Sequence, residues 1–430
     1  MTVHAIPVPQ RRGACPGLSA PMPTGDGLLV RLLPIGTIPL AAFADLCAAA
    51  RTYGNGVIEI TSRGSIQVRG LSAGSAPSFA AAAAALGIAA QDGIPVHCNA
   101  LSGLDAEELL DANALAADLR AALTQRSIAA RLGAKVCVAI DGGGPLDLAR
   151  LAADIRVYAQ ATSDDIVLHV GIGGDETNAT DLGVVARAQC VEAVLRLLDV
   201  LASRPYGARA RDVLAAEGAG PFRAAIANLL VSNAPPHLTR ACHEAIGVHR
   251  LHDGSLACGI GLGFGHADAA ALERLVDAAD ALGANGLRAA PSRVLMTIGL
   301  KPEAVSDFTA AADRLGFIVR PNDPRRHVVA CAGAPICASA HIAARTIAPL
   351  IAERIAPHRD GAFTVHVSGC AKGCAHAAAA ALTVVGTPDG GALVANGTVR
   401  DAPFAVVAVD QLPGAIACYA RERNSESADV

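Results

Sequence analysis

The stretch Ser368-Gly369-Cys370-Ala371-Lys372-Gly373-Cys374 is the part of the chain that the rest of the fold must position. A second pair of cysteines, Cys331 and Cys337, lies upstream, so the spacing is C-x5-C, an interval of 32 residues, then C-x3-C. A run rich in β-branched residues precedes each pair, which predicts a strand before each one. An apolar helical pattern over residues 342–355 follows Cys337. We therefore expect all four thiols on strand-to-helix turns, where free backbone N–H groups and the positive helix end favour thiolates.

The spacing of the four cysteines limits what they can bind. Structural zinc usually needs two tight C-x2–4-C pairs, and C-x5-C is too wide for one of them. Disulfides would require export, of which the sequence shows no sign. A [4Fe–4S] cluster fits the spacing best, and zinc or ordinary core cysteines are the alternatives. With a cluster, Gly333, Gly369 and Gly373 would let backbone amides approach its sulfides.

The cysteine pattern also carries a family resemblance. C-x5-C followed by S-G-C-A-K-G-C resembles the sulfite and nitrite reductase superfamily, in which the last cysteine lies between the cluster and the iron of a sirohaem. The longer motif S-G-C-A-K-G-C-A-H, with Lys372 and His376, is more similar to one branch, the precorrin-3B synthases of aerobic cobalamin biosynthesis. The resemblance covers nearly the whole chain and is specific at the cysteines and at an internal repeat.

This resemblance implies an iron–sulfur monooxygenase that hydroxylates the tetrapyrrole precorrin-3A with O2 and forms a γ-lactone ahead of ring contraction. It implies a separate mononuclear non-haem iron and a [4Fe–4S] cluster held by Cys331, Cys337, Cys370 and Cys374. NADH is then the ultimate electron source. The glycine-rich stretch after residue 170 has Glu176 where a dinucleotide loop needs its third glycine, so we expect a reductase or ferredoxin partner instead of a nicotinamide site.

Length and composition narrow the class of protein. The chain has 430 residues, too many for one ordinary core, so at least two domains are expected. A net charge of −4 gives no reason to expect nucleic acid as a partner. The longest apolar run, residues 79–90, is shorter than the roughly 20 residues of a membrane span, and we expect no signal peptide. Twelve cysteines without export indicate reduced thiols and a metal centre in a cytoplasmic protein.

A β-α-β-β pattern occurs twice, and each copy has an Asn-Gly pair, a Ser-Arg bend and a final Gly-Leu pair at matching places. We expect an α+β fold with duplicated sulfite/nitrite reductase-like architecture, in which two ferredoxin-like half-repeats and two larger α/β domains surround a pseudo-two-fold axis. The expected half-repeats are 1–100 and 250–322, and the α/β domains are 101–240 and, with the iron–sulfur site, 323–410. The first α/β domain should have strands at 135–140 and 165–170 and helices around 109–123 and 184–201. The tail after Arg421 should lack fixed structure.

Three arginines are candidates for binding substrate carboxylates. Arg63 matches the strand arginine with which members of the resembled family contact the carboxylates of a tetrapyrrole, and Arg293 is its counterpart in the second copy. A guanidinium can bind a carboxylate through two parallel hydrogen bonds. Arg31 is a weaker candidate. For Arg31 and for Arg69 exposure on the surface is the better interpretation.

Lys135, Lys372 and His376 are the candidates for catalytic roles. Lys135 matches one of two active-site lysines of the resembled family, and Cys137 stands in place of the other. The segment 94–99 lacks an arginine that binds sulfite or nitrite in that family, which favours tetrapyrrole oxidation over anion reduction. His376 and His366 could bind the substrate, ligate iron or be structural. The rival functions are a sirohaem-dependent sulfite or nitrite reductase and a non-catalytic iron–sulfur electron carrier.

Overall fold

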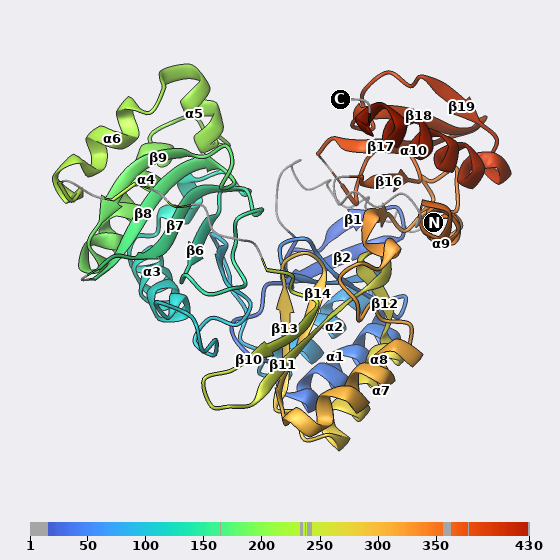
Figure 1. Cartoon of the computed structure of the whole chain (residues 1–430), viewed down its shortest axis with the longest axis horizontal. Helices are drawn as coiled ribbons and strands as arrows, with labels where there is room; N and C mark the ends of the chain where they lie inside the picture. Colours follow the sequence, from blue (N-terminus) through green and yellow to red (C-terminus); the bar gives the residue numbers. More distant parts are fainter. Residues whose placement is uncertain are drawn as a thin grey trace, which may run out of the picture.

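Two copies of one β-α-β-β-α unit lie together in the lower part of the computed structural model (Figure 1). The structure describes residues 16–163, 165–232, 235–236, 238, 243–355, 363–376 and 378–428. The elements of the first copy are β2 (Gly27–Leu32), α1 (Leu40–Tyr53), β3 (Val57–Ile60), β4 (Ile66–Leu71) and α2 (Ser75–Ala85). Those of the second are β11 (Leu256–Gly261), α7 (Ala269–Ala281), β13 (Gly286–Ala290), β14 (Val294–Leu300) and α8 (Val305–Arg314). The strand orders β2-β4-β3 and β11-β14-β13 match, and β1 (Met22–Thr24) and β10 (Gly247–Arg250) extend the same edge of each sheet.

The repeated Asn-Gly and Gly-Leu pairs have one structural cause in both copies. Gly70 has φ +72°, and a Cβ added to it would lie 2.5 Å from the Cβ of Asn55. Gly299 has φ +86°, and its added Cβ would lie 2.3 Å from Nδ2 of Asn285. Each asparagine therefore packs onto a glycine of the paired strand, in a backbone conformation that other residues rarely adopt. The sequence repeat thus preserves a contact that needs both residues.

The two copies form backbone hydrogen bonds with each other across their interface. β12 (His266–Asp268), from the second copy, pairs with β3 of the first, and Ile38 from the first forms a bridge with Leu287 in β13 of the second. The bends also meet, because Arg63 bridges Pro291 and Ser292 N donates to Ser62 O at 3.1 Å. Helices α1 and α7 pack against each other below (Figure 1). This reciprocal arrangement confirms the predicted fold class, a duplicated α+β architecture around a pseudo-two-fold axis.

Two larger α/β lobes rise from this base, and their sheets share one topology. The strands of lobe 1 are β5 (Val96–Cys98), β6 (Val138–Asp141), β7 (Ala153–Ala161), β8 (Ile166–Gly174) and β9 (Thr180–Val185). Those of lobe 2 are β15 (Val328–Ala330), β16 (Val365–Ser368), β17 (Ala380–Thr387), β18 (Gly390–Gly397) and β19 (Ala405–Val407). In both sheets the first three strands run parallel and the last two antiparallel.

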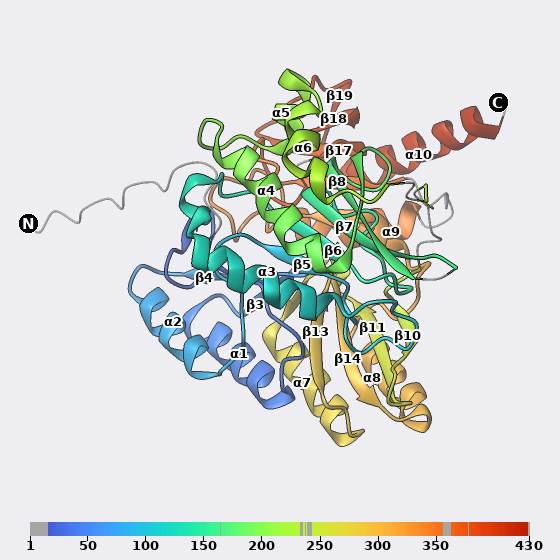
Figure 2. The ribbon, with the colours of Figure 1, turned by 90° about the vertical axis from the view of Figure 1, so that its left-hand side faces the viewer.

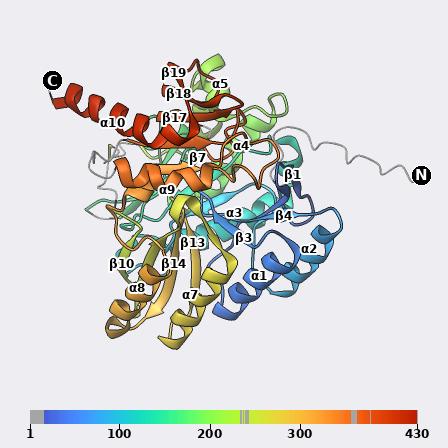
Figure 3. The ribbon, with the colours of Figure 1, turned by 90° about the vertical axis from the view of Figure 1, so that its right-hand side faces the viewer.

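Helices cover the outer side of each lobe. Figure 2 shows α3 (Ala112–Arg126) and α4 (Cys190–Ala202) over the sheet of lobe 1, together with α5 (Ala210–Glu217) and α6 (Gly220–Ile226). Figure 3 shows α9 (Ala344–Ile355) and α10 (Leu412–Ala428) over lobe 2. Asp111 caps the start of α3 by accepting hydrogen bonds from Asn113 N and Ala114 N. No helix among the described residues is both long and apolar enough to cross a membrane.

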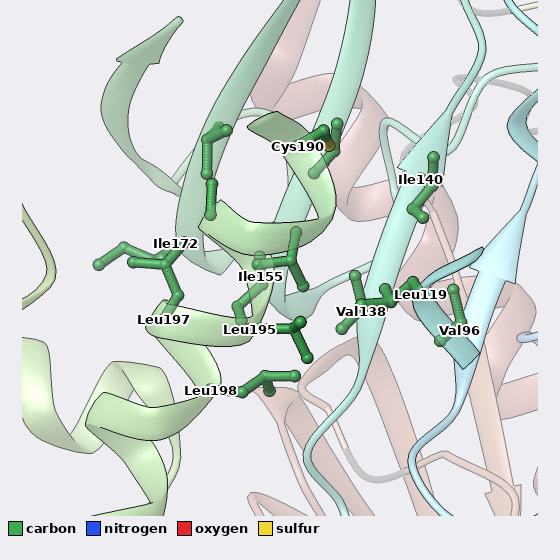
Figure 4. Packing of buried hydrophobic residues seen from close by; sticks show 14 of the residues in the cluster. Val96, Leu119, Val138, Ile140, Ile155, Ile172, Cys190, Leu195, Leu197 and Leu198 are labelled. Carbon is green, nitrogen blue, oxygen red and sulfur yellow. The ribbon is translucent and has the colours of Figure 1, made fainter. Parts of the chain in front are cut away.

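Packing between α4 and its sheet forms the core of lobe 1. Leu195 and Leu198 of α4 are almost fully buried and lie against Val138 and Ile155 of the strands (Figure 4). Burial of each such side chain stabilises the fold by about 1.5–3 kcal/mol relative to an exposed position. Lobe 2 has a separate core in which Ile347 and Ile351 of α9 join Val365 and Val367 of β16. The loops at the strand ends are thus held by two independent cores.

Several elements differ from the sequence predictions, among them β7, α4 and α10. β7 was not predicted, because its polar residues hide the strand pattern. The helix expected from residue 184 begins at Cys190, since Val184 and Val185 belong to β9. The prediction that the tail after Arg421 lacks fixed structure is wrong as far as Ala428, where α10 ends.

Candidate functional site

The two cysteine pairs lie on neighbouring loops at one edge of the sheet in lobe 2. β15 and β16 are adjacent and parallel, so their carboxyl ends meet at the same edge. Cys331 comes directly after β15, and Cys370 lies two residues beyond β16. Backbone hydrogen bonds join the loops, from Cys331 N to Val367 O at 3.2 Å and from His341 N to Gly369 O at 2.8 Å. The fold therefore brings together four thiols that are distant in sequence.

The thiols influence one another electrostatically. Burial raises the pKa of Cys331, backbone N–H groups of Gly369 and Gly333 lower it, and the thiols of Cys370 and Cys337 raise it again. Gly369 N donates to Cys331 Sγ at 3.1 Å. Burial likewise raises the pKa of Cys374, and the other three cysteines add to the effect. A cation bound to these sulfurs would remove this penalty, because it stabilises the deprotonated ligands.

The donor set fits an iron–sulfur cluster better than the alternatives. All ten described cysteines are free, which excludes a disulfide between the pairs. Among the described residues, no three His, Cys, Asp or Glu side chains converge closely enough to hold a single metal ion. A cluster spreads its four sulfur ligands over several iron atoms, so neighbouring thiols that do not converge on one point suit it and disfavour zinc. A Cβ on Gly25 would lie 2.1 Å from Cys337 Sγ, so the half-repeat approaches the thiol as closely as a glycine allows.

The surroundings of the cysteines differ from the predicted strand-to-helix turns. After Cys374 the chain enters β17 and no helix follows, while α9 begins seven residues beyond Cys337. The second pair is therefore not on a strand-to-helix turn, and individual backbone N–H groups contact the sulfur of Cys331 in the first pair. Gly333 and Gly369 supply such groups. Gly373 has another role, since its added Cβ would lie 2.8 Å from the Val399 side chain.

The two candidate lysines have different surroundings. Lys372 is exposed, and its Nζ donates to Ser339 Oγ at 2.8 Å, which links one cysteine loop to the other. Lys135 is exposed on the segment before β6 in lobe 1. The segment that carries Lys135 does reach the bend of the first half-repeat, because Arg63 Nη1 donates to Cys137 Sγ at 3.5 Å.

A network of buried charges lies between lobe 2 and the first half-repeat. Arg69 binds Asp26 through two hydrogen bonds of 2.8 and 2.7 Å and reaches Glu59 at 3.4 Å. Arg345 on α9 also binds Glu59, at 2.8 Å. Burial alone would lower the pKa of Arg69, but Asp26 and Glu59 raise it above its usual value. The expected surface position of Arg69 is therefore wrong, since the residue is 9% exposed and is held by two carboxylates.

Arg63, in the bend between β3 and β4, and Arg31, in β2, both influence the charge state of one histidine. Burial, together with the nearby charges of Arg63 and Arg31, lowers the pKa of His97 to about 4. Arg63 is half-buried. Arg31 is also half-buried rather than on the surface, and its guanidinium donates to the Gln67 side chain when the amide oxygen of Gln67 faces it. His97 was not predicted as a site residue, and only its position within the segment 94–99 pointed to it.

A pocket with about 490 Å3 of empty volume opens where lobe 1 meets the two half-repeats. Arg63, Arg120 and Arg288 line it, and no carboxylate does. Arg288 is committed to the carbonyl oxygens of Ala100 and Ser102, at 3.2 and 2.9 Å. The sequence indicated few cations near Arg63, because α3 and β13, which supply the other two arginines, are far from it in the chain. The number of arginines therefore does not separate an anion reductase from a tetrapyrrole oxidase.

Arg293 belongs to the second half-repeat, and His376 belongs to lobe 2. Arg293 lies on the second bend, next to the bend of Arg63, and His376 lies two residues beyond Cys374. The ring of His376 is 5.6 Å from that of His366, which lies inside β16. By contrast, the glycine-rich stretch of lobe 1 is a hairpin between β8 and β9. A dinucleotide loop leads into a helix, so this stretch is not one.

Comparison with known proteins agrees with this geometry. Residues 20–86 match the family model described as the nitrite/sulfite reductase ferredoxin-like half domain. The chain is 38% identical over 412 residues to a precorrin-3B synthase from Sinorhizobium sp., covering 96% of this chain and 88% of that protein. It is 27% identical over 153 residues to a sulfite reductase [ferredoxin] of Mycobacterium tuberculosis, covering 34% of this chain and 28% of the reductase. The solved structure of the M. tuberculosis NirA protein superposes with a TM-score of 0.74 at 20% identity, covering 91% of this chain and 79% of that one, which shows a shared fold.

Proposed function

Because the chain belongs to the precorrin-3B synthase family, we propose that it hydroxylates precorrin-3A with O2 and closes a γ-lactone ahead of ring contraction. The observation that carries the proposal is the 38% identity, which extends over 96% of the chain and so includes both half-repeats and both lobes. The matches to sulfite reductases cover about a third of the chain. Relatives of both kinds are enzymes, which favours an enzyme over a passive electron carrier.

Cys331, Cys337, Cys370 and Cys374 would hold a [4Fe–4S] cluster in lobe 2. When bound, such a cluster supplies electrons one at a time, which the reaction of O2 requires. Gly369 N, which donates to Cys331 Sγ at 3.1 Å, stabilises a ligand thiolate. Lys372 keeps the two loops in register through its 2.8 Å hydrogen bond to Ser339, which makes it a positioning residue.

Arg63 and Arg293 would bind carboxylates of the substrate. They lie on the two bends that meet at the pseudo-two-fold axis, so a macrocycle with acetate and propionate groups on its rim could contact both. Each planar guanidinium can bind a carboxylate through two hydrogen bonds. Arg31 lies beside His97 and Arg63 and extends this positive region. Lys135 is exposed at the edge of lobe 1 and would contact the substrate only at the rim.

Electrons would come from NADH through a separate reductase or ferredoxin, since the glycine-rich hairpin of lobe 1 does not have the form of a nicotinamide loop. The family resemblance also implies a mononuclear non-haem iron, for which the described residues would have to supply ligands. The described residues offer no group of three or more His, Cys, Asp or Glu side chains that could hold a single ion. They do not fit such an iron, and no step of the proposed reaction is assigned to one.

The test is turnover with labelled oxygen. Anaerobically purified protein, supplied with precorrin-3A, a reductant and ¹⁸O2, should yield a hydroxylated lactone that carries one ¹⁸O atom in its new hydroxyl group. The same preparation should not oxidise a reduced dye when sulfite or nitrite is added. Dye oxidation that depends on sulfite or nitrite, without labelled product, would instead establish the sirohaem-dependent reductase.

A further inference from the structure

The turn between β1 and β2 of the first half-repeat lies against the loop that carries Cys337. Ala338 N donates to Gly25 O at 2.9 Å, which joins the two backbones at this point. A Cβ added to Gly25 would lie 2.1 Å from Cys337 Sγ, but 3.4 Å from Cys337 Cβ and 3.5 Å from Ser339 N. The last two distances are ordinary van der Waals contacts. The thiol alone therefore occupies the space that a side chain at position 25 would need.

The backbone of this turn does not itself require a glycine at position 25. Gly25 lacks the positive φ that favours glycine, whereas Gly27 has φ +114°. The turn between β10 and β11 of the second half-repeat also contacts a lobe, since His252 N donates to Leu104 O at 2.9 Å. That turn has side chains at both His252 and Asp253. The missing side chain at Gly25 is therefore explained by the thiol that it faces.

The two backbones are also held from other sides, so neither can easily withdraw. Next to Gly25, the Asp26 side chain is 1% exposed and accepts two hydrogen bonds from Arg69, at 2.8 and 2.7 Å. On the other side of the contact, Cys337 N donates to Gly333 O at 2.8 Å. Rotation of the Cys337 thiol about its Cα–Cβ bond is then the motion that could make room for a side chain at position 25.

A free thiol and a cluster ligand differ in this rotation. A cysteine side chain has a single rotatable bond before its sulfur, and a free thiol can move from one staggered position to another. A thiolate bound to iron is fixed at the cluster and cannot turn away. The space at Gly25 is therefore needed by Cys337 as a ligand and not by Cys337 as a free thiol.

We propose that Gly25 is a positioning residue of the iron–sulfur site, which keeps open the orientation in which Cys337 binds the cluster. The first half-repeat, held in place by the pair of Asp26 and Arg69, then belongs to the cluster site although it supplies no ligand. The inference rests on the proposed function, which includes a [4Fe–4S] cluster on the four cysteines, and adds a residue from another domain on which that cluster depends.

The test compares two glycine-to-alanine variants of the full chain. Gly25→Ala places a methyl group against Cys337 Sγ, whereas Gly17→Ala is the matched control, because a Cβ added to Gly17 would meet nothing within 4 Å. After anaerobic reconstitution, iron and sulfide per chain, the EPR signal of the reduced cluster and the rate of iron loss to a ferrous chelator are measured. Gly25→Ala should lose iron roughly 10- to 100-fold faster than wild type, as expected for overpacking of a fixed group. Gly17→Ala should match wild type, and all three cluster-free proteins should unfold at the same denaturant concentration.

A double variant covers the case in which Gly25→Ala destabilises the cluster-free protein. Cys337→Ala removes Sγ, so its addition to Gly25→Ala should restore the unfolding midpoint to that of Cys337→Ala alone. A double variant that stays as unstable as Gly25→Ala would show that the new methyl group meets something other than the thiol, and would overturn the inference.

A rate of iron loss and an EPR signal equal to those of wild type in Gly25→Ala would also overturn the role of Gly25, and would leave the proposed hydroxylation in place. A wild type that assembles no cluster would overturn this role together with the cluster assignment. A wild type that holds a cluster, loses it faster in Gly25→Ala and incorporates no ¹⁸O would keep the role of Gly25 and lose the monooxygenase.

Discussion

The two α/β lobes have the same strand order but close their strand-end loops in different ways. In lobe 1, Asn99 follows β5, donates to Leu146 O at 2.6 Å and accepts from Gly142 N at 2.8 Å. Asp141 ends β6 and accepts from Leu148 N at 2.8 Å. In lobe 2 the corresponding strand ends lead to Cys331 and Cys370. The two lobes therefore share one strand order but differ in these loops. In lobe 1 the side chains of Asn99 and Asp141 hydrogen-bond to the loop backbone, and in lobe 2 the loops carry cysteines.

The difference also concerns what supports each set of loops. Lobe 1 is stabilised internally, since Arg209 binds the buried Asp154, which also accepts from the backbone of Cys137 at 3.0 Å. Lobe 2 is stabilised by contacts with the first half-repeat. Ala338 N donates to Gly25 O at 2.9 Å, and Arg345 binds Glu59. We therefore expect mutations in lobe 2 to change the iron content of the protein, and mutations in lobe 1 to change its stability alone.

The largest difference is expected between cysteines at equivalent edges of the two sheets. Cys370→Ser should abolish the EPR signal of the reduced cluster and most of the bound iron and sulfide, because a ligand is lost. Cys98→Ser, at the end of β5 in lobe 1, should leave the iron content unchanged. Full cluster occupancy in Cys370→Ser would show that lobe 2 does not use this ligand.

A loss of stability without loss of iron is expected inside lobe 1. Asp154→Ala leaves Arg209 and two backbone N–H groups without their acceptor, which should lower the free energy of unfolding by about 3–5 kcal/mol. Iron per folded protein should equal that of wild type. Denaturant unfolding of the anaerobic protein measures the first quantity and chemical iron analysis the second. A parallel loss of iron would mean that the lobes are not independent.

A smaller and pH-dependent effect is expected below lobe 2. Burial would raise the pKa of Asp26, but hydrogen bonds and the charge of Arg69 hold it below its usual value. The stabilisation is therefore complete above the unfolded pKa and is lost as pH falls through the folded one. Asp26→Asn should cost about 1–3 kcal/mol at pH 7, and the difference from wild type should shrink below about pH 4. A difference that stays constant through acidic pH would contradict the ion pair.

The smallest effect is expected at Lys372. Its hydrogen bond to Ser339 is exposed, so Lys372→Met should change stability by less than about 1 kcal/mol and leave the cluster in place. The rate of cluster loss in air should rise, because one of the hydrogen bonds that join the two cysteine loops is lost. Ser339→Ala removes the same bond from the other side and should match it. Unequal rates for the two variants would give Lys372 a role beyond this contact.

How much the sequence revealed depended on how far apart the interacting residues lie in the chain. The cysteine spacing and the Asn-Gly and Gly-Leu pairs are local patterns, and both identified the fold. β7 was not predicted because its polar residues Asp154, Arg156 and Gln160 are typical of a surface segment. Inside the fold, Arg209 binds Asp154, and Arg156 donates to a backbone carbonyl group. Arg69 was misplaced because Asp26 lies 43 residues away. The buried ring nitrogens of His366 have no hydrogen-bond partner among the described residues, and this depends on the whole fold around β16, which no local pattern encodes.

The absorption spectrum of anaerobically purified protein tests the central claim most directly. If lobe 2 holds a [4Fe–4S] cluster and the bends at the axis receive a colourless tetrapyrrole as substrate, the spectrum should show the broad brown band of the cluster and no Soret band. Iron and sulfide should each approach about four per chain. A stoichiometric Soret band, with oxidation of a reduced dye by sulfite or nitrite, would contradict the account and identify a sirohaem reductase.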